Sequence, residues 1–196
     1  MRPALVILCG MLLSCQAPPT TFTPVDAPSE WQSDWVRAAP VGATTTAEQW
    51  DANAEAAFAG EVKTMTSVRA TASPMDFYGS ALFDGFDLTV QPLDNALRGV
   101  KRLGSLTVVL YDFDVDTLSG QGGELMRWHV PATQMRTLWK PGRFDAAYRM
   151  KLAWTRRPSC DYVKMSVRFT TFDGEVFALL ITPGSIDQPR YRWLTK

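Results

Sequence analysis

Residues 163–181 read VKMSVRFTTFDGEVFALLI and carry the clearest structural signal of the chain. The first half alternates apolar and polar residues, which is the period of a strand with one buried face. Asp173-Gly174 is a typical turn pair. The run 176–181 is apolar throughout and predicts a strand that is covered on both faces. This stretch therefore predicts two β-strands joined by a turn.

The period of two recurs throughout the residues before this stretch. Alternating or apolar segments lie at 62–69, 86–91, 106–111, 124–130 and 148–155. Seven such segments, with a second turn pair at Asp84-Gly85, predict an all-β protein. We expect an antiparallel β-sandwich of about seven strands with Ig-like or calcium/lipid-binding-domain-like topology. This domain is placed at 61–185, and a tail at 186–196 is expected to cover a sheet edge or the strand 176–181.

Short helices are expected before the strands and between them. Thr46-Ala-Glu-Gln49 has the form of a capping box, and apolar residues follow it at helical spacing until Gly60. This pattern predicts a short helix over 48–60. Pro131 precedes Met135 and Leu138, which predicts one or two helical turns there.

Composition excludes two broad classes of protein. The chain has 196 residues, with 20 Lys and Arg against 20 Asp and Glu, and 46% of its residues are hydrophobic. A disordered polyelectrolyte would be less apolar and more charged. A dedicated nucleic-acid binder would carry a basic excess. We therefore expect no nucleic-acid partner.

The first residues predict export and lipidation. A positive start at Arg2 precedes the apolar run 4–13, which is too short to cross a bilayer and is typical of a signal peptide. The run ends Leu12-Leu13-Ser14-Cys15, which resembles the lipobox of bacterial lipoproteins. That resemblance implies removal of residues 1–14 and diacylglycerol on Cys15, with the acylated N-terminus held in the lipid bilayer. Gln16, rather than Asp, then favours the outer membrane, facing the periplasm.

A tether is expected to separate this anchor from the domain. Residues 15–47 are rich in Pro, Thr and Ala and show no strand or helix period. Trp31 and Trp35 interrupt the tether, and we expect them to dock on the domain because indoles are rarely left in water. After removal of the signal, Cys160 is the one remaining thiol that is not an anchor. The domain therefore has no internal disulfide and depends on its core.

Four segments together resemble a bacterial family. They are Gly104–Tyr111, then Trp128–Pro131 with Met135–Trp139, then Val167–Gly174. Their order is similar to that in uncharacterised secreted planctomycete lipoproteins with a single β-sandwich domain. The likeness covers about residues 84–182, and the chain departs from the family pattern at His129 and Phe172. It implies a compartment and a fold but no activity.

An acidic run provides one candidate site. Asp112, Asp114 and Asp116 share a face of an extended chain, and crowded carboxylates suit Ca²⁺. The spacing does not match a calcium helix-loop-helix, but Asp173 or Asp84 would supply a second side of a cup at the tips of a sandwich. The alternative is that the three carboxylates simply face water at the end of a strand.

Basic residues provide a second candidate site. If 146–156 and 161–171 form a hairpin, four cations lie on its outer face: Arg149, Lys151, Lys164 and Arg168. Like charges on neighbouring positions of two paired strands repel each other unless an opposite charge neutralises them. Acids on an adjacent strand would do so, and an anionic partner such as lipid headgroups or an acidic glycan is the alternative.

The sequence does not predict an enzyme. His129 is the sole histidine and is expected to point away from the side of Trp128 and Val130. A zinc site lacks ligands, and a catalytic triad lacks a nucleophile elbow. We therefore predict a lipid-anchored envelope lipoprotein that binds an envelope protein or glycan, or has a structural role, without a cofactor. A calcium-dependent adhesion or lipid-binding module and an envelope glycan hydrolase are the alternatives.

Overall fold

The computed structural model describes residues 34–39, 52–60, 63–79, 82–112, 123–141, 146–155, 157–158 and 162–183. Within these ranges the strands are β1 (Trp35–Arg37), β2 (Ser67–Met75), β3 (Gly85–Leu93), β4 (Gly104–Asp112), β5 (Glu124–Val130), β6 (Trp139–Lys140), β7 (Ala147–Ala153), β8 (Val163–Thr171) and β9 (Val176–Ile181). The helices are α1 (Ala52–Ala59) and α2 (Ala132–Leu138).

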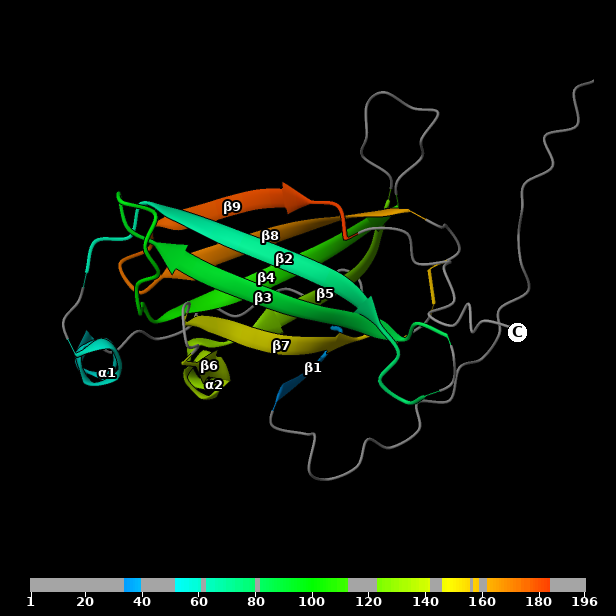
Figure 1. Cartoon of the computed structure of the whole chain (residues 1–196), viewed down its shortest axis with the longest axis horizontal. Helices are drawn as coiled ribbons and strands as arrows, with labels where there is room; N and C mark the ends of the chain where they lie inside the picture. Colours follow the sequence, from blue (N-terminus) through cyan, green and yellow to red (C-terminus); the bar gives the residue numbers. More distant parts are fainter. Residues whose placement is uncertain are drawn as a thin grey trace, which may run out of the picture.

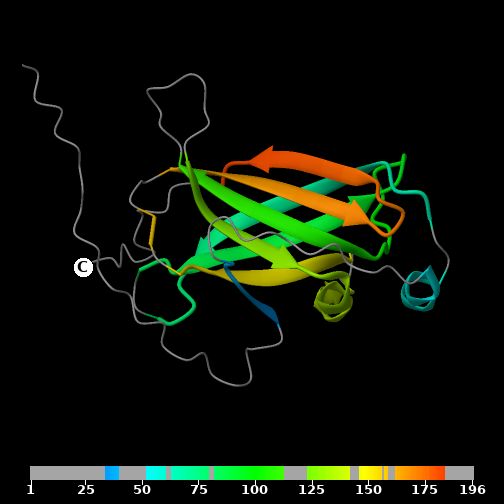
Figure 2. The same ribbon diagram turned by 180° about the vertical axis from the view of Figure 1, so that it is seen from behind.

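Two sheets lie face to face, as Figures 1 and 2 show. Among the described residues, the first sheet has the order β1-β7-β3-β2, with β6 also paired to β7. The second sheet has the order β5-β4-β8-β9. The predicted all-β, sandwich-like fold is confirmed, and six of the seven predicted strands coincide with observed ones. The seventh, at 62–69, overlaps β2 only at 67–69, because the strand begins later than the alternation suggested.

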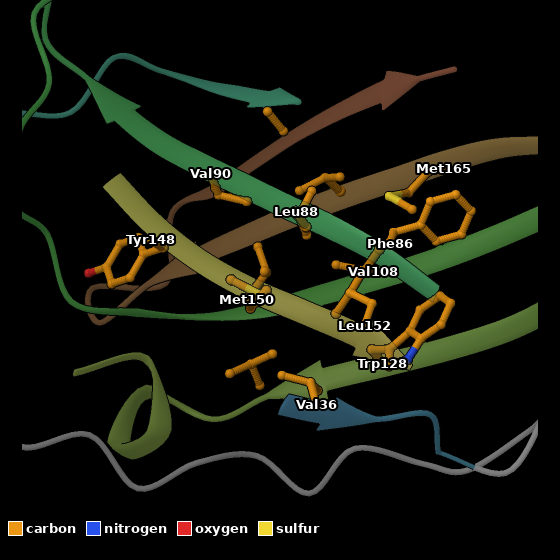
Figure 3. Close-up of a cluster of buried hydrophobic side chains, with 14 of the residues drawn as sticks. Val36, Phe86, Leu88, Val90, Val108, Trp128, Tyr148, Met150, Leu152 and Met165 are labelled. Carbon is orange, nitrogen blue, oxygen red and sulfur yellow. The ribbon is translucent and has the colours of Figure 1, made fainter. Parts of the chain in front are cut away.

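The strand alternation creates the core. Inward residues of both sheets are buried together, and Figure 3 shows Phe86, Leu88 and Val108 meeting between the layers. Trp128 of β5 also links the layers, because its indole N–H donates to the Ala153 carbonyl of β7 at 3.0 Å. The largest fully buried side chains include aromatic residues from both sheets, so burial of apolar area stabilises the sandwich.

The N-terminal strand corrects the prediction that the sandwich is wholly antiparallel. β1 pairs with β7 in the parallel sense, with Val36 opposite Leu152, so the first sheet is mixed. Two residues after β1, the Ala39 N–H donates to the Arg127 carbonyl of β5 at 2.6 Å. The segment 34–39 therefore contacts both sheets and closes one side of the sandwich.

The predicted hairpin between 146–156 and 161–171 is wrong. β7 pairs with β3, β1 and β6, whereas β8 pairs with β4 and β9 in the other sheet. An alternating pattern determines which face of a strand is buried, but it does not identify the neighbouring strand. The chain therefore crosses from one sheet to the other between these two strands.

The expectation for 176–181 is also wrong in part. The inward residues Phe177, Leu179 and Ile181 pack against the core, but the outward side chains of Val176 and Leu180 are 55% and 60% exposed. β9 is a sheet edge that is covered on one face. The tail 186–196 that was expected to cover it lies outside the described residues.

The turn and helix predictions are mostly confirmed. Gly174 has φ 85° and its N–H donates to the Thr171 carbonyl, which closes the turn between β8 and β9. Gly85 is not in a turn but begins β3. α1 lies within the predicted helix and is followed by Gly60, whose N–H donates to the Ala56 carbonyl. α2 follows Pro131 as expected.

Candidate functional site

Residues 34–39, the first segment of the chain that the structure describes, dock on the sandwich. Trp35 of β1 contacts two rings of the segment between β2 and β3, with centroid distances of 5.0 Å to Phe77 and 5.5 Å to Tyr78. Val36 points the other way and is only 3% exposed (Figure 3). Docking of Trp35 is confirmed, and Trp31 lies outside the described residues. We call residues 34–39 with Phe77 and Tyr78 the entry site.

Two features hold Phe77 and Tyr78 in place. Gly85 has no Cβ, and a Cβ there would overlap both the Leu152 carbonyl and the Phe77 ring. The Asp84 carboxylate accepts the backbone N–H groups of Phe77 at 2.8 Å and Tyr78 at 3.1 Å. Burial raises the pKa of Asp84 despite these hydrogen bonds, which favour its ionised form. Asp84 therefore has a structural role at the entry site.

Polar contacts fix the remainder of the entry site. The Lys140 Nζ lies 3.2 Å from the Asp34 carboxylate, and the Gln134 side chain donates to the Trp35 carbonyl at 3.4 Å. The ammonium of Lys151 lies 5.9 Å from the centroid of the Phe77 ring. Contacts from α2, β6 and β7 thus hold Asp34, Trp35 and Phe77 in place within the entry site.

A buried ion cluster lies at one end of the sandwich and was not predicted. The Arg102 Nε lies 2.8 Å from a carboxylate oxygen of Glu55 on α1, and both side chains are almost fully buried. A second guanidinium nitrogen lies 3.4 Å from Asp173 in the turn between β8 and β9. Arg102 also donates to the Lys63 carbonyl at 3.1 Å. One cation thus joins the helix to a distant hairpin turn.

The surroundings of this cluster shift its two carboxyl groups in opposite directions. Burial raises the pKa of Glu55, although Arg102 favours the charged form. The hydrogen bond from the Thr171 hydroxyl lowers the pKa of Asp173, and Arg102 adds to this shift. Beside them, the Tyr148 hydroxyl donates to the Arg102 carbonyl, and burial raises the pKa of this tyrosine. The cluster is a structural clamp for α1.

The Glu55 shift predicts a pH dependence of stability. Glu55 holds its proton more tightly in the folded state than in the unfolded state. Its contribution to the free energy of unfolding therefore increases as the pH falls toward the ordinary pKa of 4.5 and decreases as the pH rises. The Asp173 contribution has the opposite sign, and it is lost only as the pH falls below 3.8. We expect Glu55→Gln to reduce the change in the free energy of unfolding between about pH 7 and about pH 5, while Asp84, whose pKa is also raised, keeps its own contribution of the same sign.

The measurement is urea unfolding at several pH values. Glu175→Gln removes an exposed glutamate and is the matched control, so it should keep the wild-type slope. An unchanged slope in Glu55→Gln would show that burial of Glu55 is not the source of the dependence.

The four basic residues of the second candidate site do not share a face. Arg149 and Lys151 lie on the first sheet, and Lys164 and Arg168 lie on the second. Lys151 stands directly opposite Asp87 of β3, so an acid on the adjacent strand accounts for one of the four charges. The single basic face predicted from the sequence is therefore wrong.

The acidic candidate site is only partly described. Asp112 ends β4 opposite Val163, and Asp114 and Asp116 lie outside the described residues. Asp173 follows the opposite end of the β4–β8 pair, where Gly104 stands opposite Thr171, so it cannot complete a site with Asp112. The described residues contain no group of three metal-ligating side chains. The calcium cluster stays a prediction.

The remaining candidates are the histidine and the cysteines. His129 lies on the outer face of the second sheet, away from buried Trp128, as predicted, and its Nδ1 is 3.2 Å from the Thr107 hydroxyl. Cys15 and Cys160 lie outside the described residues. Sequence reasoning missed Glu55 and Arg102. The available signal was a glutamate on the apolar face of a short helix, since a buried acid needs a cation.

Comparisons with known proteins add no constraint. No family model, curated protein or solved structure matches the chain. The similarity to planctomycete lipoproteins therefore stays a prediction. In the part of the chain that the structure describes, neither helix is long and apolar enough to span a membrane.

Proposed function

We propose that this chain is a lipid-anchored envelope protein whose sandwich acts as a binding or structural module. The observation that carries the proposal is the entry site, where the chain joins the sandwich through a strand that contacts both sheets. A domain at the end of an anchored tether is pulled at the residues where the tether meets the domain. Contacts of those residues with the core transmit the pull to the whole sandwich rather than to a loop.

The length of the proposed tether is consistent with this arrangement. Residues 16–33 separate the proposed acylated Cys15 from the start of the entry site. Eighteen residues reach at most roughly 65 Å when fully extended. The sandwich would therefore stay near the bilayer while remaining free to meet an envelope protein or glycan. The outer membrane, facing the periplasm, is the proposed location.

An Ig-like strand order supports a binding role within this proposal. We assign the letters A to G to β2, β3, β4, β5, β7, β8 and β9. One sheet is then A-B-E and the other D-C-F-G, whereas the constant-type Ig sandwich has A-B-E-D and C-F-G. The two arrangements differ in one strand, which favours Ig-like over calcium/lipid-binding-domain-like topology. Many cell-surface binding domains share this architecture, and this support is by analogy alone.

The anchor is tested by Cys15→Ser in the full chain. We expect the wild-type protein to incorporate labelled palmitate and to partition into the detergent phase, because acyl chains give stable membrane anchoring. Cys15→Ser should lose the label and most of the partitioning. Cys160→Ser, the matched control, should behave as wild type. Equal partitioning of Cys15→Ser and wild type, with no label in either, would remove the proposal.

A further inference from the structure

β9 is the border of the second sheet, and among the described strands it pairs only with β8, although it also lies close to β2 of the first sheet. Figures 1 and 2 show it as the outermost strand of the second sheet. At the other borders, β5 is bridged to Ala39, β7 is covered by β1 and β6, and β2 carries Arg69 and Pro74. Charges and prolines are the usual means by which edge strands avoid pairing with other chains. β9, with the sequence VFALLI, has neither.

The backbone of β9 presents hydrogen-bonding groups at its open edge. The Thr171 N–H donates to the Glu175 carbonyl at 2.9 Å, which marks these residues as a hydrogen-bonded pair of the β8–β9 ladder. Such pairs alternate along an antiparallel ladder, so residues 177, 179 and 181 direct their N–H and C=O groups toward β8. The backbone groups of Val176, Ala178 and Leu180 therefore point to the open edge.

The same three residues form an exposed apolar row on the outer face. This row is symmetric about Ala178, because Val176 and Leu180 are each two residues away. We propose that β9 is the interface for a second copy of this chain, paired antiparallel across a two-fold axis through Ala178. In that register Val176 of each copy meets Leu180 of the other, and the small Ala178 lies on the axis.

The proposed register pairs the outward-directed backbone groups of β9, which have no partner among the described residues. The residues with outward-directed N–H and C=O groups stand opposite one another as hydrogen-bonded pairs, which makes about six hydrogen bonds. The two second sheets then continue across the dimer as one sheet. No charged residue of β9 meets another, because the strand contains none.

Charges outside the strand also suit a second copy. Arg168 stands opposite Ala178 in β8, so the two copies of Arg168 lie three strand spacings, or about 14 Å, apart. That separation exceeds the screening length of about 8–10 Å in physiological salt.

The size of the interface predicts its strength. A six-residue edge pairing buries much less than the roughly 1,600 Å² of a standard stable interface. We therefore expect a weak, concentration-dependent dimer.

A cysteine on the proposed axis tests the pairing. The full chain is prepared in mild detergent with Cys9, Cys15 and Cys160 replaced by Ser, so the result does not depend on lipidation. Directly opposed residues of a hydrogen-bonded pair have Cα atoms about 5.5 Å apart, within the range of a disulfide. With diamide as the oxidant, we expect Ala178→Cys to form a covalent dimer in most molecules.

Thr71→Cys is the matched control, because Thr71 is exposed on β2, the edge strand of the other sheet. We expect this variant to remain monomeric under the same oxidation. Addition of Leu180→Lys to Ala178→Cys should reduce the yield of covalent dimer at least fivefold, because a charged lysine on an edge strand disfavours pairing with another chain. Equal dimer yields at positions 71 and 178, or a monomeric Ala178→Cys with a reactive thiol, would overturn the proposal.

Discussion

Arg102→Met is expected to lower the unfolding free energy by about 3–5 kcal/mol, the usual cost of leaving a buried charge without its partner. The substitution removes the cation that faces Glu55 at 2.8 Å and Asp173 at 3.4 Å. It also removes the donor to the Lys63 carbonyl. Without Arg102, Glu55 is a buried charge with no cation beside it, and protonation removes that charge. The decrease in unfolding free energy should therefore be larger at neutral than at mildly acidic pH. Urea unfolding followed by tryptophan fluorescence measures it.

Two further variants distinguish the effect of the buried Arg102–Glu55 ion pair from other effects of replacing an arginine. Arg98→Met removes an ion pair with Asp94, but the Arg98 side chain is 77% exposed, so we expect a loss below about 1 kcal/mol. Adding Glu55→Met to Arg102→Met removes both buried charges and should recover much of the stability. A single Arg102→Met variant that unfolds like wild type would show that the cluster does not hold α1.

Trp128→Ala is expected to cost a similar amount, about 3–5 kcal/mol, because it leaves a large cavity in the core. Trp128 is fully buried between the sheets, and its N–H bonds the Ala153 carbonyl of the opposite sheet at 3.0 Å. Trp128→Phe removes that hydrogen bond but keeps most of the ring volume, so we expect about 1–3 kcal/mol. The same urea experiment measures both variants.

A control for the loss of an aromatic residue at the surface is Tyr162→Ala. Tyr162 is 49% exposed, so its removal should change the unfolding free energy little. If Trp128→Ala were no more destabilising than Tyr162→Ala, Trp128 would not lie between the two sheets.

The strands could be predicted because each buries one face. In β8 the inward residues Val163, Met165, Val167 and Phe169 are all fully buried, as their alternation with polar residues required. The same signal gave β5 with the correct ends. A strand with one face packed against a core alternates apolar and polar residues, and this alternation can be seen in the sequence alone.

Strand pairing could not be predicted to the same extent. β7 and β8 are neighbours in the sequence and both alternate, but they belong to opposite sheets. β9 looked buried on both faces because it is wholly apolar, yet its outward residues are exposed. Composition does not distinguish a central strand from an unguarded edge, since both consist of apolar residues.

The candidate sites depended on contacts between residues far apart in the sequence. Arg102 meets residues 47 positions before it and 71 positions after it, and no local pattern records such a pairing. β1 is three residues long, which is too short to show a period. Only the two tryptophans in the tether indicated that part of it docks, and Trp35 does so.

Hydrogen exchange at residues 35–39 tests the central claim, that the chain enters the sandwich through a strand bonded to both sheets. In the full chain we expect the β1 amides that point toward β7, and the amide of Ala39, to exchange slowly, with protection close to that of neighbouring β7, because they are hydrogen-bonded within the fold. Exchange of these amides at the rate of an unstructured peptide, with β7 still protected, would contradict the account.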